Sequence, residues 1–203
     1  MNKPDQIIDN SLRVVAHMCN KFGIDESHAV KHSFEVFNYA KNIYMSECTT
    51  TLAEQQNVIY AAAILHDMCD KKYMDEQDGV AEIRKFASMF MTEEEVAAVI
   101  AIIQTMSYSK VKQRGFPELG KYQLAYHIVR EADLLAAYDI DRCIMFSMFH
   151  ENMCYAEALY RSKHLFKTRV LTYRSDDLFV TEQSKRLSKV LHHLAVKHLK
   201  MML

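Results

Sequence analysis

The sequence has few of the residues that interrupt helices. Its 203 residues include only four Gly and two Pro, and half of them are hydrophobic. Gly and Pro are the residues that most often end a helix or form a turn, so this composition is typical of helices joined by short connections. A chain of this length and apolar content can bury one sizeable core. We therefore expect a compact, single-domain, all-α fold of roughly seven to nine helices over residues 1–203.

Further absences argue against several classes of protein. No apolar run approaches the roughly 18–20 residues of a membrane span, and the N-terminal segment lacks the unbroken apolar stretch of a signal peptide. The formal net charge is −1, which gives no overall basic field for duplex nucleic acid. The five Cys form no CxxC pair, which is typical of a reducing compartment. We expect a cytoplasmic protein that binds neither a membrane nor duplex nucleic acid.

Apolar periodicity and capping residues predict the individual helices. These helices cover residues 4–22, about 25–46, 51–65, 80–90, 93–107, 121–149, 151–173 and 176–201. Thr92 and Glu95 have the spacing of a capping box. The basic segment 107–120 is expected to be a long loop, either solvated or lying over an anionic substrate.

The candidate metal ligands lie on three of the predicted helices. His66 and Asp67 end an apolar run, where both side chains are costly to bury without a partner. His32 lies on an earlier helix, on the same face as His28 four residues before it, and Asp133 is flanked by apolar residues. Two imidazoles and two carboxylates suit Mn²⁺, Fe²⁺, Co²⁺, Ni²⁺ or Zn²⁺, with Mg²⁺ as a further candidate. We predict one divalent metal ion held by His32, His66, Asp67 and Asp133.

The residues that follow the His66-Asp67 pair suggest phosphate chemistry. A metal held in this way polarises a phosphoryl oxygen and lowers the pKa of water. Asp70 could orient or deprotonate that water, or protonate a leaving oxygen. Lys71 and Lys72 would neutralise the charge of a phosphate.

Four stretches, in this order, resemble the HD-domain superfamily of metal-dependent phosphohydrolases. They are SHAVKHSFEV, AAILHDMCDKKY, VIAIIQTMSYSK and READLLAAYDIDR, and they lie within about residues 24–175. Their order and spacing are most similar to the small bacterial branch that acts on nucleoside triphosphates, which has LHDxxDxKF-like, IIxxIS-F/Y and DADRLDA-like motifs. The resemblance implies the all-α HD fold, with a C-terminal helix, about 176–201, packed on the metal-site core.

The same resemblance implies roles for individual residues. It assigns one divalent metal to His32, His66, Asp67 and Asp133. Asp70 matches the acidic residue that assists water in related nucleotidases. Lys72 matches the lysine of the same motif and His28 a frequent upstream histidine, so we predict that His28, Lys71 and Lys72 bind substrate.

The chain also departs from the family pattern. Leu134 replaces an Arg and Ala136 replaces an acidic residue of DADRLDA, which puts specificity for triphosphates in question more than the metal site. Only His127 lies between Asp67 and Asp133, so the two-metal members, such as cyclic-dinucleotide phosphodiesterases and inositol oxygenases, are disfavoured. The stretch HDMCDK, in place of HDxxED, disfavours the stringent-response hydrolases.

The leading hypothesis is a metal-dependent phosphohydrolase acting on a small phosphorylated metabolite, above all a nucleotide. Pyrophosphate release from a nucleoside triphosphate ranks slightly ahead of phosphate release from a monophosphate. Two alternatives stay open at this point: a non-catalytic HD-fold sensor that binds nucleotide or metal, and a purely structural helical protein. The sequence also leaves open whether the chain forms a homodimer.

Overall fold

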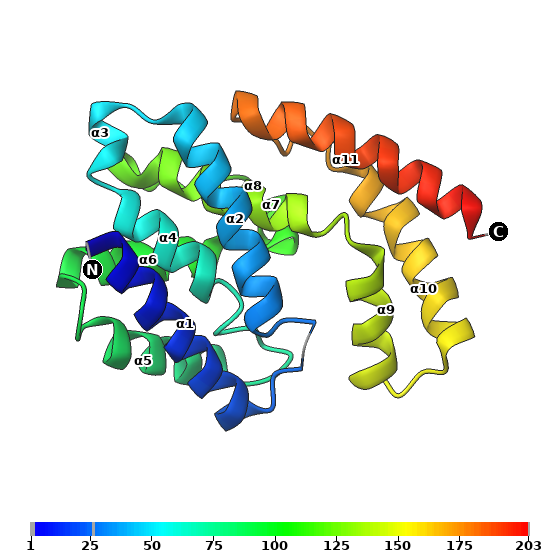
Figure 1. Cartoon of the computed structure of the whole chain (residues 1–203), viewed down its shortest axis with the longest axis horizontal. Coiled ribbons are helices and arrows are strands. Elements are labelled where there is room, and N and C mark those ends of the chain that lie inside the picture. The colour runs from blue at the N-terminus through cyan, green and yellow to red at the C-terminus, as the bar shows by residue number, and fades with distance from the viewer. Residues whose placement is uncertain (1–2, 26, 203) are drawn as a thin grey trace.

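The regular structure of the chain is helical throughout the part that the computed structural model describes, residues 3–25 and 27–202 (Figure 1). The α-helices are α1 (Lys3–Phe22), α2 (Val30–Glu47), α3 (Thr50–Ala53), α4 (Gln56–Leu65), α5 (Glu76–Ala87), α6 (Glu93–Thr105), α7 (Tyr108–Arg114), α8 (Gln123–Ala136), α9 (Ile140–Phe149), α10 (Tyr155–Thr168) and α11 (Glu182–Met201). Two short 3-10 helices, Gly120–Tyr122 and Val170–Thr172, complete the set. The all-α prediction is confirmed. The predicted number of helices is too low, because the described residues form eleven α-helices.

Polar caps account for two of the extra helices, α7 and α9. The long helix predicted over 121–149 is divided into α8 and α9, because Asp139 accepts a hydrogen bond from the backbone N–H of Asp141 and begins a new helix. The segment predicted as a loop after α6 contains α7, which begins at the cap Ser107 and ends at Gly115, whose φ is 75°. These caps act over one helical turn, and apolar periodicity alone does not reveal them.

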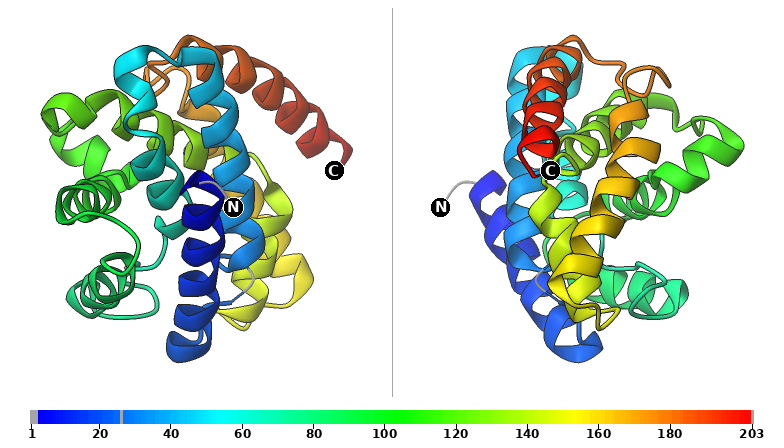
Figure 2. Two further views of the ribbon diagram at one scale, coloured as in Figure 1. Left: turned by 60° about the vertical axis from the view of Figure 1, so that its left-hand side comes forward. Right: turned by 90° about the vertical axis from the view of Figure 1, so that its right-hand side faces the viewer.

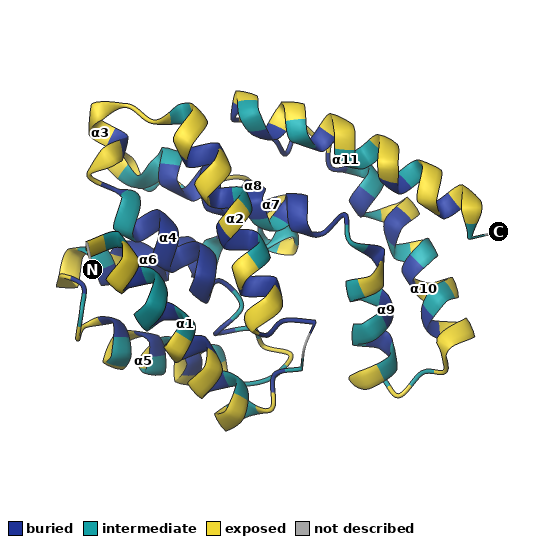
Figure 3. Ribbon diagram, viewed as in Figure 1, coloured by how far each residue is buried: buried dark blue, intermediate teal, exposed yellow. Residues whose placement is uncertain are grey.

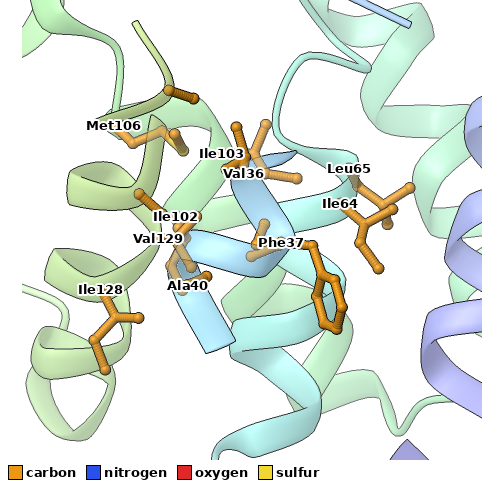
Figure 4. Close-up of a cluster of buried hydrophobic side chains, with 14 of the residues drawn as sticks. Val36, Phe37, Ala40, Ile64, Leu65, Ile102, Ile103, Met106, Ile128 and Val129 are labelled. Carbon is orange, nitrogen blue, oxygen red and sulfur yellow. The ribbon is translucent and has the colours of Figure 1, made fainter. Parts of the chain in front are cut away.

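The centre of the core is α4. All of its residues from Val58 to Leu65 are buried, and three consecutive Ala allow neighbouring helices to approach closely. α1, α2, α6 and α8 all pack directly on α4, which is dark blue over most of its length in Figure 3. Figure 4 shows this core cluster, with Val36, Phe37 and Ala40 of α2, Ile64 and Leu65 of α4, Ile102 and Ile103 of α6, and Ile128 and Val129 of α8. The C-terminal end of α4 and the first turn of α2 are thereby held together inside the molecule.

The last three helices, α9, α10 and α11, form the side of the molecule opposite α1 (Figure 1). α9 and α10 pack side by side (Figure 2), and α11 packs on α8 and α2. α11 begins at Glu182, capped by Thr181, which is later than the predicted start at 176. α1 and α11 have 20 residues each, and each has one buried and one exposed face (Figure 3). Within the described residues, no helix combines the length and the apolar character needed to cross a membrane.

A buried carboxylate fixes the connection into α11. Glu131 of α8 is fully buried and accepts hydrogen bonds from the backbone N–H groups of Val180 and Thr181 and from the Thr181 hydroxyl. The guanidinium group of Arg130, which is also buried, donates to Glu131 at 3.1 Å and to the carbonyl of Leu178. The segment before α11 is thus bonded to the same helix that carries Asp133.

Candidate metal centre

Three packed helices bring the predicted metal ligands to one place. His32 lies in the first turn of α2, His66 is the C-terminal cap of α4, and Asp133 lies in the last turn of α8. α2, α4 and α8 pack on one another in all three pairs, so these helix ends meet. One ligand atom from each of the three residues lies within 4.8 Å of the others, and the two Nε2 atoms are 3.1 Å apart. This group could hold a metal ion.

Asp67 adjoins this group. Its Oδ2 atom lies 3.1 Å from Nε2 of His66 and 3.4 Å from Nε2 of His32. That oxygen is buried and accepts no hydrogen bond from any described residue. A buried carboxylate oxygen that faces two imidazole nitrogens is the expected environment of a cation. The use of Asp67 as a fourth ligand stays a prediction.

The orientation of the two imidazoles fits a metal. The Nδ1–H of His66 donates to the carbonyl of Ala63 at 2.9 Å, which leaves the Nε2 atom facing the carboxylates. Nε2 of His32 accepts from the guanidinium group of Arg142 at 2.7 Å, so its lone pair is also on Nε2. Nitrogen lone pairs and carboxylate oxygens therefore converge, and this donor set suits a divalent transition metal.

The electrostatics of the site favour a positive charge at this point. Burial by itself lowers the pKa of His66, but the carboxylates of Asp67 and Asp133 raise it to about 9. Burial raises the pKa of Asp67 and Asp133, but the neighbouring imidazoles hold the pKa of both below the usual range. In the metal-free protein, a proton on His66 supplies the positive charge that the two carboxylates favour, and a metal cation would supply it in the same place.

Arg142 is a residue of this site that the sequence analysis missed. Burial lowers the pKa of Arg142, but Asp133 and Asp67 raise it, so the guanidinium group stays charged. Its hydrogen bond to His32 uses the lone pair that a metal would need, so the bond and metal ligation exclude each other. The available signal was a charged residue within the apolar sequence of α9, IDRCIMFSMF.

A cleft of about 420 Å³ opens next to the candidate ligands. Its walls include the predicted residues Asp70, Lys71, Lys72 and His28, together with Arg142. Further lining comes from Tyr108 and Lys110 of the basic segment 107–120, and from Glu76 and Arg169, which the sequence analysis did not connect with the site. The volume is within the range of about 300–1,000 Å³ that is usual for small-molecule sites.

The residues after Asp67 differ in how closely they face this cleft. Asp70 accepts from the backbone N–H of Lys72 at 3.0 Å, and its Oδ2 atom lies 3.4 Å from the Lys72 ammonium group. Lys71 pairs with Glu76 at 3.1 Å, and its side chain is 73% exposed. Lys72 is therefore better placed than Lys71 to meet a substrate. The catalytic role of Asp70 stays a prediction.

His28 lies in the turn before α2, which begins at Val30, so the prediction that His28 and His32 share a helix face is wrong. The two rings are nevertheless near each other, with centroids 6.2 Å apart. Nε2 of His28 accepts from the Lys72 ammonium group at 3.1 Å, and Nδ1 lies 3.0 Å from the Tyr73 hydroxyl. Burial is the main cause that lowers the pKa of His28 to about 4; the charge of Asp67 opposes it and the cations of Lys72 and Arg142 add to it, so the ring stays neutral.

Only part of the basic segment 107–120 reaches the cleft. Lys110 of α7 lines it and donates to Glu76 at 3.0 Å, whereas Lys112 pairs with Asp176 elsewhere. Tyr108 also lines the cleft, and its ring lies under the guanidinium group of Arg169 at 4.5 Å. Arg169 comes from the end of α10, far along the chain from α7.

The two positions that depart from the family pattern do not line the cleft. Leu134 and Ala136 are 3% and 1% exposed and belong to the hydrophobic core. The guanidinium groups of the cleft come instead from Arg142 and Arg169.

Comparisons with known proteins show the fold. No protein-family model and no curated protein sequence matches the chain. The chain is similar to a protein from Lactobacillus plantarum whose crystal structure was solved as a structural-genomics target, with a TM-score of 0.71 and 20% sequence identity. The match covers 98% of this chain and 94% of that chain. The helical arrangement is thus one that crystallography has already found in another protein.

Proposed function

We propose that the protein is an HD-type, metal-dependent phosphohydrolase that acts on a small phosphorylated metabolite, above all a nucleotide. The observation that carries this proposal is the group of His32, His66 and Asp133, whose ligand atoms converge beside a cleft with basic walls. The order of the HD-like motifs along the sequence supports the same reading.

In the proposed hydrolysis, some residues of the cleft neutralise the charge of the phosphate and others transfer protons. A divalent cation, when bound by His32, His66, Asp133 and the adjoining Asp67, supplies a Lewis acid for the phosphoryl group and a lower pKa for water. Lys72, together with the arginines of the cleft, would bind phosphoryl oxygens.

Proton transfer falls to Asp70 in this proposal. Its Oδ2 atom takes a proton from the attacking water as the new bond to phosphorus forms. The same carboxyl returns the proton to the leaving oxygen as the old phosphorus–oxygen bond breaks. Both pyrophosphate release from a triphosphate and phosphate release from a monophosphate are compatible with this assignment.

One observation favours a second candidate, an HD-fold sensor that binds nucleotide or metal without turnover. Arg142 donates a hydrogen bond to the Nε2 lone pair of His32, so in the metal-free site a positively charged side chain already occupies the place of one metal–ligand bond. In a sensor, metal binding would release Arg142, and that movement would be the signal.

Release of phosphate and pyrophosphate from a nucleotide panel in Mn²⁺ tests the proposal. We expect turnover by the wild type and a loss of about 10²-fold or more in Asp133→Asn. Arg142→Met should lower kcat/KM by about 10²-fold while retaining Mn²⁺, because it removes a charge that meets the phosphoryl group. Asp176→Asn, which neutralises a carboxylate outside the cleft, is the control and should keep full activity.

Two results would contradict the enzyme reading. Tight, metal-dependent nucleotide binding without turnover would favour the sensor. Equal activity in the wild type and Asp133→Asn would place the chemistry elsewhere.

A further inference from the structure

A second cavity of about 250 Å³ lies between α9 and α10. We call it the α9/α10 cavity and define it by Phe146 and Ser147 of α9 and by Ser162 and Leu165 of α10. The two helices pack side by side on the far side of the molecule from α1 (Figure 1). The hydrolysis proposed above assigns no role to these four residues.

The α9/α10 cavity continues the metal-site cleft. His28, Lys72, Arg142 and Arg169 line both, so these four side chains form the boundary between the two spaces. A molecule with a phosphate at this boundary could therefore extend into either one. Because the metal ligands Asp67 and Asp133 line only the cleft, the reacting phosphate belongs on the cleft side.

The lining of the α9/α10 cavity beyond the boundary with the cleft is mostly apolar and includes the hydroxyl-bearing residues Ser147, Ser162 and Tyr173. Leu165 and Val170 supply aliphatic walls and Phe146 an aromatic one. Ser147 and Ser162 line it as well, and both are buried. Ser162 is 1% exposed, and its Oγ atom has no hydrogen-bond partner among the described residues. Buried hydroxyls are nearly always paired, so an unpaired one that lines a cavity indicates a ligand or water that completes it.

The metal-site cleft and the α9/α10 cavity also differ in the charged residues that line them. The cleft contains the carboxylates of Asp70 and Glu76 as well as the metal-site acids, whereas none of the described residues lining the α9/α10 cavity is acidic. Its remaining cation, Arg161, is paired with Glu151 at 2.6 Å. The other cations, Lys72, Arg142 and Arg169, all lie at the boundary, so the interior suits an uncharged group.

We infer that the α9/α10 cavity binds the uncharged organic group of an organic phosphate ester while the phosphate lies at the boundary with the cleft. The group that fits is compact and carries hydroxyls, of the size of a sugar or a nucleoside, with Ser147 and Ser162 as its hydrogen-bond partners and Leu165 as an apolar wall. This inference rests on the proposed phosphohydrolase function. It places substrate selection on α9 and α10, away from the metal ligands, and it excludes inorganic phosphates as preferred substrates.

Calorimetric binding of three probes in the presence of Mn²⁺ tests this inference without requiring turnover. The probes are inorganic phosphate, ribose 5-phosphate and adenosine 5′-monophosphate. In the wild type, at least one organic phosphate should bind about tenfold or more tightly than inorganic phosphate, because only it fills the second cavity.

Variants on α10 then locate the effect. Leu165→Phe should reduce that preference to about threefold or less by filling the cavity, with inorganic phosphate binding unchanged. Ser162→Leu should do the same, and Leu165→Phe answers the question if the buried Ser162 variant does not fold. Leu159→Phe is the matched control, because Leu159 is also a half-buried leucine of α10 but does not line the cavity.

The outcomes separate the inference from the proposed function. Equal affinity for all three probes, or a preference that survives Leu165→Phe, would overturn the inference while leaving a metal-dependent phosphate site intact. Failure of every probe, inorganic phosphate included, to bind in a Mn²⁺-dependent way would contradict the proposed function itself. A preference lost in Leu165→Phe and kept in Leu159→Phe would support the inference.

Discussion

His66 lies between two carboxylates, and its Nε2 atom carries either a proton or a metal ion. The pKa of about 9 means that the metal-free protein holds a proton there at neutral pH. Metal binding must expel that proton, so the affinity for metal and the pH are linked.

We expect the affinity of the metal-free protein for Mn²⁺ to rise by about tenfold per pH unit between about pH 7 and 8.5. The folded pKa of His66 is above its ordinary value of 6.5, so protonated His66 stabilises the metal-free protein fully below pH 6.5 and progressively less as the pH rises through about 9. The competing proton is lost in the same range, which strengthens metal binding.

Calorimetric titrations in buffers of different ionisation enthalpy measure both the affinity and the number of protons released. We expect release of about one proton per metal ion near pH 7.5. An affinity that does not change over this pH range would contradict the assignment of His66 as a ligand.

The turn that carries Asp67 depends on how closely α5 approaches it. A Cβ atom at Gly79 would lie 2.6 Å from the carbonyl oxygen of Met68 and 2.7 Å from Cα of Cys69. Both are backbone atoms that cannot rotate away, so only glycine allows this contact.

Gly79→Ala should therefore lower the free energy of unfolding by about 1–3 kcal/mol and weaken Mn²⁺ binding by about tenfold, because the Asp67 turn must shift. Gly23→Ala is the matched control: Gly23 has a φ of 67° but nothing near a new Cβ atom. It should cost about 1–2 kcal/mol through backbone strain alone and leave metal affinity unchanged. Urea unfolding and metal titration of the two variants measure these effects, and wild-type metal affinity in Gly79→Ala would refute the argument.

The sequence predicts correctly those features that depend on residues close together in the chain. The capping box of Thr92 and Glu95 forms as predicted, because both partners lie within one helical turn. His66 and Asp133 could be singled out because polar side chains in or at the end of an apolar helical run need a partner, and His32 because of its spacing from His28; the structure brings these three together.

The parts that were missed depend on contacts between distant elements. Arg142 contacts His32 because α8 ends at Ala136 and a separate helix, α9, begins at Ile140. The apolar periodicity of residues 121–149 does not predict this break. Arg169 enters the cleft from the end of α10, and no pattern near it indicates α7 as its neighbour. The capping signals near Asp25 and Ser27 predict a helix that includes His28, whereas α2 begins only at Val30.

At the scale of the whole molecule, Glu131 connects α8 with the segment that leads into α11. α11 also contributes Ala195 and Leu199 to the same buried cluster as the helices of the site. We therefore expect α11 to unfold together with the rest of the chain in one cooperative transition.

Glu131→Ala should lower the free energy of unfolding by about 3–5 kcal/mol, because it leaves the buried Arg130 cation without its carboxylate and the backbone N–H groups of Val180 and Thr181 without their acceptor. Urea unfolding followed by far-ultraviolet circular dichroism measures this loss. Glu182→Ala, which removes a 70% exposed carboxylate from the start of α11, is the control and should leave the transition unchanged. A Glu131→Ala variant as stable as the wild type, or a separate early transition for α11, would contradict this account.

The central claim is that His32, His66 and Asp133 hold a divalent metal ion, and metal analysis of the purified protein after incubation with Mn²⁺ tests it most directly. We predict about one metal ion per chain in the wild type, almost none in His66→Ala, and wild-type content in His164→Ala, which removes an exposed histidine of α10. No bound metal in the wild type, or equal metal in the wild type and His66→Ala, would contradict the claim.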